Sequence, residues 1–169
     1  MMKKIIPYIL MTNLLLIVLL FIYKKDDQKN ISKLLEIEFI KEGELQLKNG
    51  VETIKKIDIE LATSEQKRVQ GLMHRSSMQE DQGMLFIFDE PKPQSFWMKD
   101  TRIPLDIIYI DSDSTVINTA KNVPPMIETG VPQSKKPAKF VLEINGGMAN
   151  QWGVKEGITK INWEAISQP

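Results

Sequence analysis

The chain has no cysteine and one histidine, and these absences exclude several kinds of site. Without cysteine there are no disulfides, no thiolate metal ligands, no cysteine nucleophile and no residue to carry a lipoprotein acyl chain. A single histidine excludes zinc sites built from several histidines. The 22 basic and 22 acidic residues balance, and no basic cluster that would neutralise phosphates is visible. We therefore expect no nucleic-acid partner.

Two common catalytic motifs are also missing. There is no G-x-S-x-G nucleophile elbow, and His74 is the only histidine available as a base for a Ser-His-Asp triad. No glycine-rich phosphate loop occurs, since Gly146-Gly147 is too short and is more typical of a strand end. The sequence predicts no cofactor and no bound metal.

The remaining composition fits one ordinary domain with a short appendage. The chain has 169 residues, of which 42% are hydrophobic and 26% are charged. That balance supports a packed core and argues against wholesale disorder.

The appendage is an uncharged N-terminal segment at residues 5–23, with the sequence IIPYILMTNLLLIVLLFIY. As a helix it would rise by just under ~30 Å, which is about the hydrocarbon thickness of a bilayer. It ends in FIYKKDDQ, without the small residues of a signal-peptidase site, so cleavage and secretion are the less favoured alternative. A buried core helix is a third alternative, but it suits a small domain poorly. We predict a membrane anchor at residues 1–25.

The flanking charges give a slight preference for topology. Lys3 and Lys4 precede the apolar segment, and Lys24 and Lys25 follow it. With the free amine, the bias favours a cytoplasmic N-terminus. The domain is then predicted to face outward, at the periplasm or the cell surface, behind a polar tether at residues 26–33.

Residues 34–169 show many short segments typical of strands. Residues 35–40 and 44–47 alternate apolar with polar around Lys41-Glu42-Gly43, which suggests a hairpin. Further strands are predicted at residues 56–61, 84–88, 96–99, 105–110, 115–119, 139–144 and 158–162. Four prolines within residues 121–137 predict a long surface loop.

One helix stands out among the strands. Thr63 is an acceptable N-cap, with Gln66 three residues later as in a capping box. Val69, Leu72 and Met73 then share one apolar face. Short strands with one short helix predict a mainly-β fold, either a small β-sandwich or a partly closed barrel, preceded by a transmembrane helix.

Four phrases, in this order, carry a family resemblance: ELATSEQKRVQGLMHR, QGMLFIF, FWMKDTRIPLDIIYID and FVLEINGG. Together they resemble the bacterial and archaeal family called domain of unknown function 192, over residues 57–163. The resemblance implies a compact β-sandwich domain, often behind a signal or anchor, and implies no reaction. The family usually has WMKNT where this chain has WMKDT, so a role that needs the amide of asparagine at Asp100 is in doubt.

The FWMKDT phrase contains the first candidate site residues. On a strand, Trp97 and Lys99 would point to the same face, and Asp100 would begin a turn. Asp106 opens the next predicted strand, within reach of Lys99 or Arg102. These side chains predict a polar site at one end of the sheet, although a turn stabilised by its own side chains explains much of the pattern.

Glu143 and Arg75 are the remaining candidates. Glu143 lies between Leu142 and Ile144, and simple alternation would place it on a solvated face. Alternatively it is partly buried and paired with Arg75 or Lys99, because an unpaired buried carboxylate is costly. Arg75 could bind a carboxylate or a phosphate, or could complement the C-terminal end of the preceding helix.

The sequence therefore favours a membrane-anchored extracytoplasmic domain that binds a small polar or anionic ligand or acts as an accessory module. The ligand would bind near Arg75, Trp97, Lys99, Asp100, Asp106 and Glu143. An alternative is a hydrolase of cell-envelope glycans that uses Asp106 and Glu143 as paired carboxylates. A weaker alternative is copper handling by His74 with Met73 and Met78, although methionine is also a common core residue.

Overall fold

The computed structural model describes residues 16–25 and 37–166. It divides into two compact units, residues 1–36 and residues 37–169. In the first unit residues 16–25 are helical, and their large apolar side chains are exposed. No helix within the described ranges is long and apolar enough to cross a membrane. The predicted anchor begins outside the described residues, and the predicted tether at residues 26–33 lies wholly outside them.

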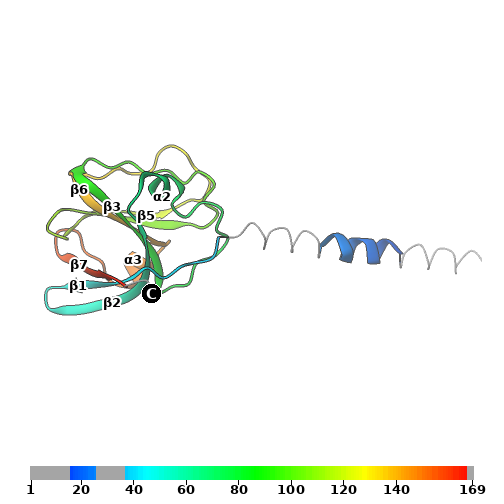
Figure 1. Cartoon of the computed structure of the whole chain (residues 1–169), viewed down its shortest axis with the longest axis horizontal. Coiled ribbons are helices and arrows are strands. Elements are labelled where there is room, and N and C mark those ends of the chain that lie inside the picture. The colour runs from blue at the N-terminus through cyan, green and yellow to red at the C-terminus, as the bar shows by residue number, and fades with distance from the viewer. Residues whose placement is uncertain (1–15, 26–36, 167–169) are drawn as a thin grey trace, which may run out of the picture. The chain divides into compact units, whose positions relative to one another are not determined.

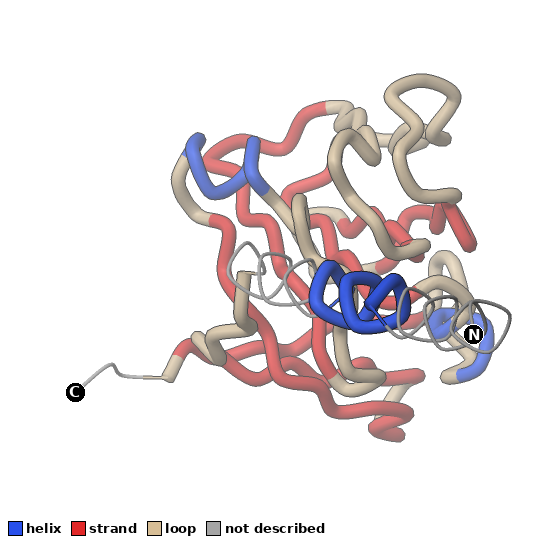
Figure 2. Tube along the Cα trace, turned by 90° about the vertical axis from the view of Figure 1, so that its right-hand side faces the viewer, coloured by secondary structure: helices blue, strands red, loops and turns tan. Residues whose placement is uncertain are grey.

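Residues 37–166, the described part of the second unit, contain seven strands and two short helices, which Figure 1 labels. In chain order they are β1 Gly43–Asn49, β2 Glu52–Ala62, α2 Glu65–Gln70, β3 Gln82–Lys92, β4 Leu105–Ile110, β5 Val116–Val123, β6 Ala138–Asn145, α3 Met148–Gln151 and β7 Thr159–Ala165. Strands dominate the unit, and loops connect most of them (Figure 2).

The strands form one mixed sheet in the order β5-β4-β6-β3-β2-β1-β7. All pairs are antiparallel except β2 with β3, whose parallel connection contains α2. The two edge strands approach each other at a single bridge, Thr115 opposite Lys160, and the Ile161 amide donates to the Ser114 carbonyl at 2.9 Å. The mainly-β prediction is confirmed. The sheet is a single open one, not the two packed sheets of a sandwich, and it carries two short helices where the sequence predicted one.

Both faces of the sheet are covered. One apolar cluster includes Leu72, directly after α2, together with Met84 and Ile107. The other includes Ala149 of α3 and Ile108. We call these sides the α2 face and the α3 face. Because both are packed, every residue of β4 is buried, although alternation usually leaves one face solvated.

Three local predictions are wrong. Residues 37–42 form no strand, and Gly43 belongs to β1, where a Cβ would lie 2.6 Å from the Glu164 carbonyl oxygen of the neighbouring β7. The hairpin turn instead follows Asn49, at Gly50. Residues 96–99 lie in a loop and a turn, because Phe96 and Met98 pack onto the α2 face without joining a ladder.

The helix prediction is correct in place but shifted by one residue at its start. Ser64, not Thr63, is the N-cap, and its hydroxyl accepts a hydrogen bond from the Lys67 amide at 3.2 Å. The loop predicted at residues 121–137 is confirmed for residues 124–137, which follow β5.

Candidate functional site

The site begins at Gly71, where α2 ends. Gly71 has φ 47° and ψ −133°, a backbone conformation that is essentially restricted to glycine. Its amide caps the helix by donating to the Lys67 carbonyl at 2.9 Å. This sharp exit directs the chain across the α2 face, so that Leu72 and Arg75 become buried.

A transverse row of side chains crosses the α2 face beneath this segment. Met84 of β3 is paired in register with Glu60 of β2 on one side and with Glu143 of β6 on the other. Residues in register on neighbouring strands point to the same face, so both carboxyl groups lie on the α2 face, two strands apart. Both are buried, with exposed fractions of 6% for Glu60 and 4% for Glu143.

Arg75 forms its ion pair with Glu60. Its Nη2 lies 2.7 Å from Glu60 Oε2, and both side chains are buried. The other oxygen, Glu60 Oε1, accepts a hydrogen bond from the Ile40 amide at 2.9 Å. Within the described part of the chain, Arg75 Nε has no hydrogen-bond partner. Arg75 therefore lies near two buried carboxyl groups but forms an ion pair with only one of them, Glu60.

Glu143, which has no ion pair within the described part of the chain, has a raised pKa. Burial raises the pKa of its carboxyl from 4.5 to about 8, and the nearby positive charge of Arg75 opposes only part of that shift. At neutral pH the group is mostly protonated and can donate a hydrogen bond. On β4, burial and then the proximity of Glu143 raise the pKa of the Tyr109 hydroxyl, which donates to the Pro132 carbonyl at 2.8 Å.

The Glu143 carboxyl faces a narrow pocket, in which about 20 Å³ is open to a water-sized group. A Cβ added at Gly71 would lie 3.8 Å from Glu143 Oε2. The pocket is lined by the end of α2 and by the loop before β4, and its residues include Gln70, Gly71, Met73, Thr101 and Glu143.

An outer pocket with about 270 Å³ of such space adjoins the first one. The two share five lining residues: Arg68, Val69, Phe86, Phe96 and Trp97. We call the continuous depression the α2 groove, with an inner pocket at Glu143 and an outer pocket along α2.

Aromatic rings form much of the groove. Phe86 of β3 meets Phe96 edge to face, with centroids 4.9 Å apart and planes at 86°. Trp97 is 44% exposed and lines both pockets. Arg68 lies over Phe88 at 5.4 Å and donates from Nη1 to the carbonyls of Thr63 and Ile87. Its guanidinium is thus held by backbone carbonyls within the wall.

Of the predicted site residues, the structure brings together Trp97, Glu143 and, behind Glu143, Arg75. Lys99 and Asp100 line neither pocket of the α2 groove. The Lys99 ammonium is exposed and lies 5.6 Å from the centroid of the Trp97 ring. Asp100 has φ 52°, and its carbonyl accepts a hydrogen bond from the His74 amide at 2.8 Å.

Asp106 belongs to a different place and does not pair with Lys99 or Arg102 as expected. It is fully buried, with Oδ1 accepting from the Asn122 amide at 2.6 Å and Oδ2 from the Ala149 amide at 2.7 Å. Those bonds fix β5 and the first turn of α3. Since Ile107 next to it is on the α2 face, Asp106 points to the α3 face. Asp106 and Glu143 therefore lie on opposite faces and form no catalytic pair.

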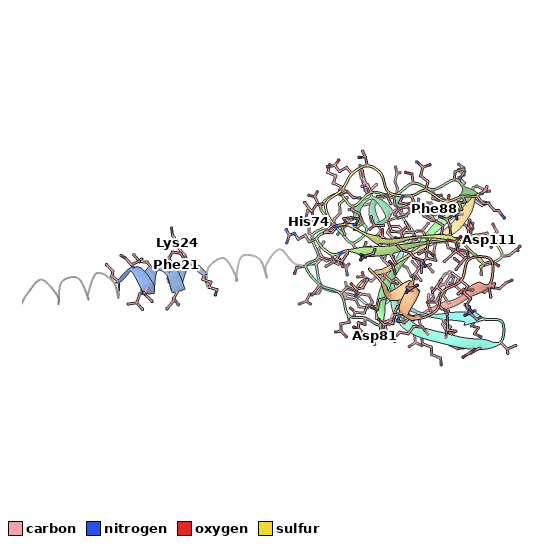
Figure 3. The ribbon with its side chains drawn as sticks, turned by 180° about the vertical axis from the view of Figure 1, so that it is seen from behind. Phe21, Lys24, His74, Asp81, Phe88 and Asp111 are labelled. Carbon is pink, nitrogen blue, oxygen red and sulfur yellow. The ribbon has the colours of Figure 1, made fainter. Side chains whose placement is uncertain are left out.

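The residues proposed for copper are divided between the core and the surface. Met78 packs against the α2-face cluster, and Met73 lines the inner pocket of the α2 groove. His74 is exposed at the surface of the domain (Figure 3). No observation assigns a metal to these side chains.

The comparisons with known proteins agree with this architecture. The family DUF192, described as Uncharacterized ACR, matches residues 45–162. The chain belongs to the DUF192 family. No curated protein matches it.

Two solved structures are similar to this DUF192 chain. One is a protein of unknown function from Novosphingobium aromaticivorans DSM 12444, with 35% identity and a TM-score of 0.66, over 71% of this chain and 84% of that one. The other is from Sinorhizobium meliloti 1021 and is described as a candidate transcription regulator, with 35% identity and a TM-score of 0.67, over 76% of this chain and 97% of that one.

The DUF192 fold also explains two features of the sequence. Asp100 lies in left-handed backbone, where asparagine and aspartate are both enriched, so either residue fits the turn. Glu60 was missed as a site residue because it alternates with Ile59 and Leu61, as a solvated residue of a half-buried strand would. No local signal reveals that Arg75 covers it.

Proposed function

We propose that this DUF192 chain is a membrane-anchored, extracytoplasmic binding domain that holds a small polar ligand in the α2 groove. The observation that carries the proposal is the buried carboxyl of Glu143 at the base of a pocket with an aromatic wall, where burial raises its pKa to about 8. Ligand pockets typically combine an apolar lining with a few converging polar groups. A neutral carboxyl there can donate a hydrogen bond to a ligand oxygen.

The charges around the groove favour a neutral ligand over an anion. Arg75 is buried and paired with Glu60, and it lines neither pocket of the groove. Arg68 lies in the wall of both pockets, where its Nη1 donates to two backbone carbonyls, and Glu65 adds a carboxylate to the outer pocket. Lys99 lies outside the groove. The base of the inner pocket, at Glu143, therefore offers an anion no cation.

Binding is also better supported than glycan hydrolysis. Hydrolysis by paired carboxylates needs both groups in one cleft, flanking the scissile bond and roughly 5 to 9 Å apart. Asp106 and Glu143 point to opposite faces of the sheet, and both Asp106 oxygens already accept backbone hydrogen bonds. Copper handling has no supporting contact.

The membrane location rests on the sequence of the first unit. Residues 5–23 carry no charge, and the helical residues 16–25 expose large apolar side chains that water solvates poorly. A reporter enzyme that folds only outside the cytoplasm, fused after the last residue, tests the topology. Reporter activity supports an outward domain. Activity only from a matched cytoplasmic reporter contradicts it.

A thermal-shift screen tests the binding proposal. The full chain, in detergent, is heated with neutral sugars, amino acids, carboxylic acids and metal salts, because a ligand that binds only the folded state raises Tm. Replacing Trp97 or Glu143 (Trp97→Ala, Glu143→Leu) should abolish the shift. Ile158→Ala is the matched control, since Ile158 is a similarly exposed side chain next to β7, outside the groove. A shift of equal size in all variants would place the ligand elsewhere and refute the proposal.

A further inference from the structure

Residues 37–42 lead into β1 and are hydrogen-bonded to β2 without forming a strand; we call them the entry segment. The Glu42 carboxylate accepts from the Leu61 amide at 2.8 Å, which is a bond to the backbone of β2. The Ile40 amide, by contrast, donates to the side chain of Glu60 at 2.9 Å. The hydrogen bond of Ile40 therefore depends on where the Glu60 carboxylate lies.

The Glu60 carboxylate is held in turn by Arg75. Glu60 Oε2 lies 2.7 Å from Arg75 Nη2, so one carboxylate joins the entry segment to the guanidinium. Both side chains also line a cavity whose walls come from the entry segment and α2, with about 170 Å³ open to water-sized groups. Since protein atoms do not fill this cavity, the two side chains have room to shift.

Arg75 has a second carboxyl group within electrostatic reach. Its positive charge acts on Glu143, which lies in the same transverse row as Glu60, two strands away. Arg75 Nε is buried and has no hydrogen-bond partner among the described residues. Because Nε and Nη2 belong to one planar fork of donors, a guanidinium can bond a different carboxylate through each of them. An ionised carboxylate accepts such a bond more strongly than a protonated carboxyl does.

Glu143 can change its charge without unfolding of the domain. The inner pocket touches its carboxyl and has about 20 Å³ open to a water-sized group, which exceeds the roughly 10–15 Å³ that one water needs. A water there can take up the proton when Glu143 ionises and pass it on to solvent. With the pKa raised to about 8, the ionisation falls within a pH range that experiments reach.

We propose that Arg75 couples the charge of Glu143 to the entry segment. When Glu143 loses its proton to the pocket water, the guanidinium shifts toward the new carboxylate and its ion pair with Glu60 weakens. The Glu60 carboxylate then moves, and the hydrogen bond from the Ile40 amide loosens. The coupling is reciprocal, so any contact that keeps Glu143 protonated also holds the entry segment on β2. It goes beyond the proposed function, because it needs no groove ligand.

The charged and titratable groups around this cluster come from several elements. Near Glu143 are Arg75, Arg68 of α2, Tyr109 of β4 and, two strands away, Glu60 of β2. Around the Glu60–Arg75 pair, the cavity adds Glu38, Glu42 and Lys67. Arg68 donates to backbone carbonyls, and Lys67 is paired with Glu42 at 2.6 Å. Arg75, in contrast, contacts Glu60, and its charge acts on Glu143.

The test is an NMR titration of the isotope-labelled full chain in detergent, without ligand, from about pH 6 to about pH 9. The carboxyl carbon of Glu143 reports its own ionisation. We expect the Arg75 Nε–H proton to move downfield with the same midpoint, because it gains a charged acceptor. The Ile40 amide should shift with that midpoint, and its protection from hydrogen exchange should fall about threefold or more. The Leu61 amide, bonded to Glu42, should keep its protection and is the internal control.

Two variants identify the group responsible. Glu143→Gln cannot ionise, so the responses of Arg75 and Ile40 should disappear. Glu164→Gln removes an exposed carboxylate of β7 and should leave both responses as in the wild type.

Three outcomes would refute the coupling. In the first, Glu143 ionises without a response at Arg75 and Ile40. In the second, Glu143 does not titrate within this range. In the third, Ile40 and Leu61 lose protection together, which indicates a general opening of the sheet. None of these outcomes depends on a groove ligand, so the failure of the coupling is distinct from a failure of the proposed function.

Discussion

Glu60 and Glu143 lie in one transverse row of the sheet, separated only by Met84, and Arg75 contacts Glu60 alone. Two buried carboxyl groups beside one guanidinium cannot both ionise cheaply. Glu60 has the direct ion pair and an amide hydrogen bond, whereas burial raises the pKa of Glu143 to about 8 and favours its protonated form at neutral pH. This division of charge supplies a hydrogen-bond donor at the base of the groove.

The first prediction concerns stability against pH. The pKa of Glu143 is about 8 in the folded chain and near 4.5 when unfolded, so between these values the folded state binds more protons. The stabilisation from this group is complete below pH 4.5 and is lost as pH rises through 8, at about 1.4 kcal/mol per pH unit. The charged or titratable groups around it are Arg75, Arg68, Tyr109 and, two strands away, Glu60.

Urea denaturation of the wild type and of Glu143→Gln at several pH values measures this term. The variant mimics the protonated group, so the difference in unfolding free energy should drift in its favour from pH 5 to pH 8 and level off above. Glu164→Gln, an exposed carboxylate on β7, is the control. Parallel pH profiles for wild type and Glu143→Gln would mean that Glu143 does not hold its proton.

The second prediction concerns the buried ion pair. Arg75→Met leaves Glu60 buried without its cation and should lower the unfolding free energy by about 3–5 kcal/mol. Adding Glu60→Gln removes the unpaired charge and should restore most of the loss, because the amide oxygen can still accept from the Ile40 amide.

A double-mutant cycle of these two changes gives the coupling energy. A coupling near zero would contradict a direct pair at 2.7 Å. Since the charge of Arg75 lowers the pKa of Glu143, Arg75→Met should also shift the pH profile of stability further upward in pH.

The third prediction separates Asp106 from the groove. Each carboxylate oxygen of Asp106 accepts one backbone amide, so Asp106→Asn replaces one acceptor by a donor and should destabilise by about 1–3 kcal/mol. The exposed Asp113→Asn, in the turn after β4, should cost almost nothing. Both variants should bind groove ligands as the wild type does when measured below their Tm. If Asp106→Asn alone lost affinity for groove ligands, Asp106 would contribute to ligand binding and the prediction would be wrong.

Much of the sheet could be predicted from the sequence. Strands such as residues 105–110 and 139–144 are short, β-branched and bounded by turn residues, and they occur where expected. The two wrong strands share one feature, which is alternation without a ladder partner. Phe96 and Met98 pack onto the α2-face cluster from a loop. Residues 37–40 alternate between half-buried and exposed but belong to no strand. The Asn49-Gly50 pair, a strong hairpin signal, marked the true turn.

The site was less predictable because it depends on loop segments that pack over the sheet and are distant in sequence from the strands. Glu143 was weighed between a solvated and a buried position, and β6 alone does not distinguish them. What buries it is the chain after Gly71 and the loop around Phe96 and Thr101, which are distant in sequence. Asp106 likewise looked like a site residue because its amide partners, on Asn122 and Ala149, come from two later segments.

The fourth prediction concerns Gly71, which forms both the helix cap and the cover of Glu143. Gly71→Ala places a methyl group 3.3 Å from Phe86 Cζ and 3.8 Å from Glu143 Oε2, in a backbone conformation with φ 47°. Gly50→Ala is the matched control, since Gly50 has φ 62° with nothing within 4 Å of the added carbon. The control should lose about 1–2 kcal/mol from strain alone. Gly71→Ala should lose more, because its backbone conformation is essentially restricted to glycine and because the added methyl group contacts Phe86. It should also bind groove ligands more weakly, because the methyl group narrows the inner pocket. Denaturation curves and ligand titrations of the two variants measure both effects. Equal losses of stability with unchanged affinity would show that the inner pocket does not take up the ligand.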